Sequence, residues 1–298
     1  MTRRDAETRG PLPVTLLRTL RKHRFLILLF PIYLVLDWIS GAHLHQTTTA
    51  ISWAPLSGLS LFVLLRWGWT GLPVLCLAHL TGDLLPGLGL PTPAAALWAD
   101  AVVLGSSVLA WIAFRRVLVF DFARPTLRRT LIFILVAAGA ALLMALTWVV
   151  ATGGAGSGGW IQFILAWSRR YVGDFIGILT TLPCLAIVDD WLGQAEGPSR
   201  LSAVAVVQAL LIATIAAVLF GWPEIDEFKT FYLLFIPVIW VSVTDGIIGA
   251  ALVIFVTQLA LFGTLILIGD HPTGEYGATH LMVVIQAVTG LLLGTVVA

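Results

Sequence analysis

The chain has 298 residues, of which 59% are hydrophobic and only 11% are charged. An ordinary soluble domain has roughly 45–50% apolar and about 25% charged residues, because its exterior must be wetted by water. The composition therefore excludes a soluble globular protein and indicates an integral membrane protein. The net charge of +1 also excludes a nucleic-acid-binding protein, because neutralising phosphates requires a strongly basic surface.

Apolar segments long enough to cross a bilayer follow one another along nearly the whole chain. A spanning helix needs about 20 mainly apolar residues, so the sequence predicts an all-α polytopic membrane bundle of about 8–10 transmembrane helices. The range arises because one segment (230–243) is short and another (161–188) is long. The predicted segments are approximately 25–42, 49–65, 69–88, 93–114, 130–151, 161–188, 201–221, 230–243, 246–268 and 279–298.

Basic residues predict the orientation of these helices, because Lys and Arg collect on the cytoplasmic side of membrane proteins. With ten spans, 14 of the 17 Lys and Arg residues fall on one side, including all those before the first span. We therefore predict a cytoplasmic basic N-terminus over 1–24, a single transmembrane domain over 25–298 and a cytoplasmic C-terminus. The last span ends without a basic flank. We expect a cytoplasmic output domain after 298, and a standalone membrane protein is the alternative.

Six charged side chains lie inside predicted spans, where an ionisable group is costly unless it faces protein or water. On the predicted topology all of them fall in the outer half of the bilayer. One interpretation is a structural ion-pair network that locks helix packing; the other is a polar cavity, open to the outer side, that binds a small ligand or a proton. Arg170 and Asp174 are spaced to share a helix face and pair. The six residues are Asp37, Asp83, Asp100, Arg169, Arg170 and Asp174.

His79 precedes Asp83 by one helical turn and joins the candidate site. A neutral histidine paired with a carboxylate is the simplest interpretation, and a pH-sensing histidine is an alternative because the unperturbed pKa is near 6.5. A haem group held by His79 and His280 is a further alternative. Trp53 lies inside a span beside the polar residues and is expected to line the pocket. We predict no cofactor and no metal site.

Several segments, taken in order, resemble the membrane-associated sensor domain, type one (the MASE family). The run Trp53-Ala54-Pro55-Leu56-Ser57-Gly58 resembles its W-x-P-x-x-G opening, and the run from Trp167 to Gly177 is similar to its central signature. Phe235-Ile236-Pro237-Val238-Ile239-Trp240 and the final helix also fit the family. The resemblance covers roughly residues 48–298. It departs from the family at Asp83, where a neutral polar residue is expected, and at His79, which belongs to no family motif.

The resemblance implies a function and a location. Such domains form the N-terminal membrane region of bacterial sensor histidine kinases and diguanylate cyclases. It therefore implies a multi-pass protein of the bacterial inner membrane, without catalytic residues, that works as a homodimer through a cytoplasmic output module. The resemblance names no common ligand.

We hypothesise a sensory domain in which a stimulus at the polar site produces a helix shift. A secondary transporter of a small solute is an alternative, because broken helices and charges at mid-membrane are also typical of transporters. A haem-binding membrane sensor is a third hypothesis. An enzyme is not expected, since the sequence contains no HExxH or CxxCH motif and no recognisable nucleophile–base pair.

Overall fold

The structure, a computed structural model, describes residues 25–38, 40, 53–83, 93–117, 126–152, 159–193, 211, 214–215, 231–268 and 276–297. All regular structure within these residues is helical, which confirms the predicted all-α class. The N-terminal segment 1–24 lies outside the described residues, as does nearly all of the predicted span 201–221.

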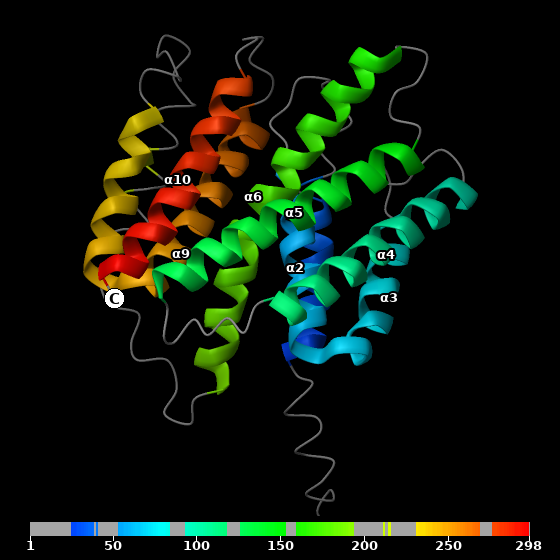
Figure 1. Cartoon of the computed structure of the whole chain (residues 1–298), viewed down its shortest axis with the longest axis horizontal. Helices are drawn as coiled ribbons and strands as arrows, with labels where there is room; N and C mark the ends of the chain where they lie inside the picture. Colours follow the sequence, from blue (N-terminus) through cyan, green and yellow to red (C-terminus); the bar gives the residue numbers. More distant parts are fainter. Residues whose placement is uncertain are drawn as a thin grey trace, which may run out of the picture.

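The helices pack side by side as a bundle (Figure 1). Among the described residues, four stretches are long and apolar enough to cross a membrane: 94–117, 127–151, 159–191 and 232–261. The elements in chain order are a first helix (Phe25–Trp38), α2 (Pro55–Trp67), the 3-10 turn η1 (Gly68–Thr70), α3 (Leu72–Asp83), α4 (Pro93–Val117), α5 (Leu127–Ala151), α6 (Gly159–Gly193), the 3-10 turn η2 (Phe231–Leu234), α9 (Phe235–Ile268) and α10 (Tyr276–Val297).

Helix α9 folds back on itself at Gly246. This residue has φ 62° and ψ −149°, a conformation that is essentially restricted to glycine. Val238 and Ile254, on opposite sides of Gly246, both border Gly290 of α10, although about 24 Å would separate them along a straight helix. The yellow and orange arms on either side of the turn can be followed in Figure 1. The predicted spans 230–243 and 246–268 are therefore the two arms of one hairpin that packs on α10.

Helix α2 begins at Pro55 and lies directly against α6. Proline suits the first turn of a helix because it has no N–H that needs a partner there. The N–H of the preceding Ala54 donates to the carbonyl oxygen of Gly173 on α6, at 3.1 Å. A Cβ on Gly177 would overlap the Ala54 carbonyl oxygen, and one on Gly58 would overlap the Gly177 carbonyl oxygen. Only small residues permit such a close approach, so these glycines bring the start of α2 to the middle of α6.

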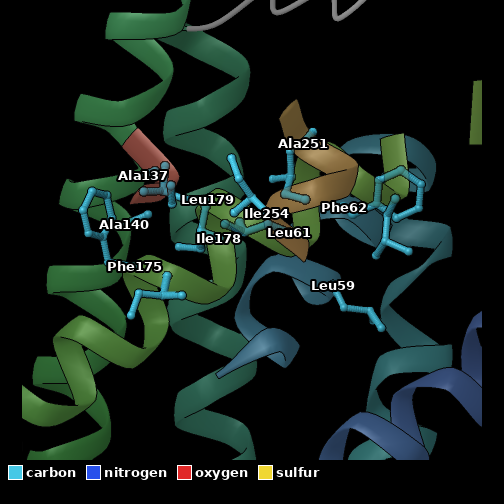
Figure 2. Close-up of a cluster of buried hydrophobic side chains, with 14 of the residues drawn as sticks. Leu59, Leu61, Phe62, Ala137, Ala140, Phe175, Ile178, Leu179, Ala251 and Ile254 are labelled. Carbon is cyan, nitrogen blue, oxygen red and sulfur yellow. The ribbon is translucent and has the colours of Figure 1, made fainter. Parts of the chain in front are cut away.

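The apolar core lies where α2, α5, α6 and α9 meet (Figure 2). Leu61 of α2, Ala137 of α5, Ile178 of α6 and Ala251 of α9 are completely buried there. The opposite faces of the same helices are apolar as well; Leu135 of α5, for example, is 71% exposed. Apolar side chains on the outside of a helical bundle are expected when lipid, and not water, surrounds it.

Side-chain contacts join helix ends on one side of the bundle. An ion pair between Arg66 and Asp189 joins the end of α2 to the end of α6. A hydrogen bond of 3.0 Å between the Thr130 and Thr295 hydroxyls joins the start of α5 to the end of α10. In Figure 1 these ends lie in the lower half of the helical bundle, with the end of α10 marked C.

Candidate functional site

One set of polar side chains surrounds Asp174 at the contact between α2, α5 and α6. Asp174 is completely buried. The Ser57 hydroxyl of α2 donates to its Oδ1 at 2.6 Å, and Arg170 Nε donates to its Oδ2 at 3.1 Å. The Arg170 guanidinium also lies 5.0 Å from the ring centroid of Trp148 on α5. In these four residues, the Asp174 group, one carboxylate and one guanidinium neutralise each other and each carboxylate oxygen has a donor.

A second set gathers where the first helix, α3 and α4 meet. It consists of Tyr33, Asp37, His79, Asp83 and Asp100, and we call it the His79 group. Residues one helical turn apart share a face, so the first helix presents Tyr33 and Asp37 together and α3 presents His79 and Asp83 together. Asp100 joins them from α4.

Direct contacts connect the members of the His79 group. His79 Nδ1 lies 3.2 Å from Asp100 Oδ1, and the Asp83 and Asp100 carboxyl groups are near enough to interact electrostatically. The Tyr33 ring packs edge to face on the His79 ring, with 5.1 Å between centroids. A Cβ placed on Gly82 would overlap the carboxylate of Asp37, so that carboxylate lies against the backbone of α3.

The electrostatics of the His79 group differ from those of an ion pair. Three carboxyl groups, those of Asp37, Asp83 and Asp100, meet one imidazole. Like charges this close cannot both be ionised without compensation. Arg170 is near enough to act electrostatically on Tyr33 and Asp37, but its guanidinium pairs with Asp174. If all three carboxyl groups were ionised, the group would carry a net negative charge, which a proton or another cation would neutralise.

Polar atoms of the His79 group are buried without a partner among the described residues. They are the Tyr33 hydroxyl, His79 Nε2, Asp83 Oδ2 and Asp100 Oδ2. Burying a polar atom without a hydrogen bond is costly, so such a concentration is unusual for a purely structural cluster. The side chains of His79 and Asp100 are still 12% and 16% exposed, so a small ligand can reach them from the surface of the bundle.

The structure thus divides the predicted polar cluster in two. Asp37, Asp83 and Asp100 gather with His79, whose ion-pair partner is Asp100 of α4 and not Asp83 of its own helix. Arg170 and Asp174 pair as their spacing predicts. The remaining predicted residue of the six, Arg169, is exposed on α6.

Two further sequence predictions have different outcomes. Trp53 is buried, with its ring 6.1 Å from that of Phe255 on α9, so this contact directs it toward the apolar core. The side chain of His280, the second predicted haem ligand, lies outside the described residues. Within the described part of the chain, no set of three or more His, Cys, Asp or Glu side chains is spaced to hold a metal ion.

Sequence reasoning missed Tyr33, Ser57 and Trp148. Tyr33 had a usable signal, because it precedes Asp37 by one helical turn and must share its face. Ser57 had none, because it is 117 residues from Asp174 along the chain. Trp148 meets Arg170 across two different helices, so local spacing could not indicate the contact.

Comparison with known proteins identifies the family. Neither a curated protein nor a solved structure matches the chain significantly. The MASE1 family profile, however, matches residues 24–298, which include every described helix and both polar groups. This match confirms the resemblance found in the sequence motifs. The chain therefore belongs to the MASE1 family, and is a membrane sensory domain of the kind found in signalling proteins.

Proposed function

We propose that this sensory domain detects a small stimulus at the His79 group and passes a helix movement to a cytoplasmic output module. The observation that carries the proposal is the excess of carboxyl groups among Asp37, Asp83 and Asp100, which meet at the junction of three helices. Binding of a ligand or a proton there changes the charge that these helices must accommodate. The free energy for switching comes from the difference in binding between two states of the domain.

Contacts between helices support a route from the group to the last helix. Helix α4, which carries Asp100, packs on α5, and α5 packs on both α6 and α10. The Thr130–Thr295 hydrogen bond links α5 to the end of α10. Gly294 of α10 borders the carbonyl oxygen of Gly246 at the turn of the α9 hairpin. Packed helices shift by about 1–2 Å in many switching proteins, and a shift of this size in α10 would reach an output module that follows it.

The proposal also includes the setting of the receptor. The chain would lie in the inner membrane of a bacterium, with the basic helix ends that carry Arg66, Arg115 and Arg129 at the cytoplasmic face. Two copies would associate through their output modules.

The test removes one charge at a time from the full-length receptor in native membranes. Asp83→Asn and Asp100→Asn retain the shape of the side chain and, for residue 100, an oxygen that accepts from His79. We expect each variant to change the basal output activity about fivefold or more, the usual range for coupled sites. Asp245→Asn makes the same chemical change at an exposed position on α9 and should leave the output unchanged.

Two results would contradict the proposal. Wild-type output in both Asp83→Asn and Asp100→Asn would show that the group does not control signalling. Solute uptake into liposomes that contain only this chain would indicate a transporter instead.

A further inference from the structure

We propose that the His79 group binds a small cation that donates several hydrogen bonds, namely ammonium or a protonated primary amine. This inference rests on the proposed function, since it names the chemical class of the stimulus. It follows from the acceptors, the buried hydroxyl and the charge that the group presents.

The group offers more acceptors than donors. A carboxylate oxygen only accepts, so His79 Nδ1–H must be the donor in its contact with Asp100 Oδ1. In the neutral ring this leaves His79 Nε2 with a lone pair. Asp83 Oδ2 and Asp100 Oδ2 also lack a donor among the described residues. Two adjacent helices, α3 and α4, therefore carry three buried acceptors without a donor.

Tyr33 supplies an independent sign that a ligand belongs there. Its side chain is only 1% exposed, and its hydroxyl has no partner within the described residues. The ring packs on His79, and Asp37, Asp83 and Asp100 all act electrostatically on the hydroxyl. The hydroxyl therefore points into the acidic group, where it can accept from a ligand or donate to a carboxylate.

The charge of the surroundings selects a cation. The titratable groups that face the site are Tyr33 and Asp37 from the first helix, His79 and Asp83 from α3, and Asp100 from α4. Arg170 of α6 is the neighbouring positive charge, and Asp174 neutralises it. An anion would be repelled by the carboxyl groups. A bound cation would instead offset the repulsion between the Asp83 and Asp100 carboxyl groups and would allow both to ionise.

Spacing and donor number favour an ammonium group over a metal ion. Among the described residues, His, Cys, Asp and Glu side chains do not come together in threes as closely as the ligands of one metal ion do. An –NH3+ group carries three N–H donors and makes charge-assisted hydrogen bonds to carboxylates. Its donors match the acceptors of His79, Asp83 and Asp100 in number.

The test uses the purified chain in lipid nanodiscs, with its melting temperature followed by tryptophan fluorescence at constant pH and ionic strength. Ammonium chloride and methylammonium chloride should each raise the melting temperature saturably. Tetramethylammonium chloride has the same charge but no N–H donor and should not. Sodium chloride serves as the reference salt.

Variants locate the binding site. Asp83→Asn and Asp100→Asn should each weaken methylammonium binding about tenfold or more, because each removes a charge-assisted hydrogen bond. Tyr33→Phe removes only a hydroxyl and should weaken it by a smaller factor, about threefold. Asp245→Asn should bind like the wild type. Should one of the Asp variants fail to fold, Tyr33→Phe still carries the test, because it leaves every carboxyl group in place.

Several outcomes would overturn the inference. Equal effects of methylammonium and tetramethylammonium would mean that only charge matters. Undiminished binding in both Asp variants would place the amine elsewhere, and stabilisation by a divalent metal but not by amines would make the site a metal site. If no amine binds but the Asp variants still alter receptor output, this inference fails and the proposed function stands. Unaltered output in those variants would instead remove the proposed function, whether or not an amine binds.

Discussion

The Asp174 group and the His79 group lie in the same bundle and are both built around aspartate carboxyl groups, but they satisfy those groups in opposite ways. Asp174 is completely buried, and each of its oxygens receives a hydrogen bond, from Ser57 and from Arg170. The His79 group contains three carboxyl groups, one imidazole and several buried polar atoms without a partner among the described residues. One group is neutral and complete, whereas the other is acidic and incomplete.

The balance of donors and acceptors around a buried carboxylate thus indicates its role in a membrane protein. Where donors match acceptors, the carboxylate holds helices together and has no capacity left for a ligand. Where acceptors exceed donors, the group depends on a proton or a ligand and can respond to its concentration. The two interpretations that the sequence leaves open, a packing lock and a sensing site, are thus best assigned to different residues.

The largest expected effect tests the packing role of the Asp174 group. Replacing Asp174 by Ala leaves the partly buried Arg170 guanidinium without its partner, and should lower the free energy of unfolding by about 3–5 kcal/mol. Asp245→Ala, at an exposed site, should change it by less than about 0.5 kcal/mol. Unfolding in denaturing detergent would measure both values. Equal losses of unfolding free energy in Asp174→Ala and Asp245→Ala would show that the Asp174 group does not hold the helices together.

A pair of glycine substitutions tests how rigidly each group is held. In Gly177→Ala the new Cβ would overlap the backbone oxygen of Ala54, so we expect a loss of about 1–3 kcal/mol from overpacking. In Gly82→Ala it would overlap the carboxylate of Asp37, a side-chain end that can rotate away. We expect that loss to stay below about 1 kcal/mol.

The melting temperature of each glycine variant would be compared with that of Gly105→Ala. A Cβ at position 105 meets nothing within 4 Å, so this variant reports the effect of a helical glycine-to-alanine change alone. A larger loss for Gly82→Ala than for Gly177→Ala would show that the His79 group is the more rigid of the two.

The smallest effect on stability is expected for charge removal in the His79 group. Asp83→Asn or Asp100→Asn relieves repulsion between neighbouring carboxyl groups, and the amide oxygen at position 100 still accepts from His79. The free energy of unfolding should stay within about 1 kcal/mol of the wild-type value or rise. Detergent unfolding at neutral pH measures it. A loss comparable to that of Asp174→Ala would mean that both groups are packing elements.

Local spacing predicted part of this arrangement. The contact between Arg170 and Asp174 follows from their positions one helical turn apart on α6. The shared face of His79 and Asp83 is equally local. The pairing of His79 with Asp100 is not, because two helices and the connection between them decide which carboxylate the imidazole meets. For the same reason, no spacing rule separates the six predicted charges into two groups.

The amino-acid sequence by itself determined the membrane location, the helical class and the approximate spans. These properties follow from local composition, because a bilayer requires every backbone hydrogen bond to be made within the spanning segment. Only the tertiary structure decided which carboxyl groups found donors. That outcome depends on close contacts between distant segments, such as the one between Gly58 and Gly177 that brings Ser57 to Asp174. No donor reaches Asp83 Oδ2 or Asp100 Oδ2 within the described residues, since the helices around them contribute mainly acceptors.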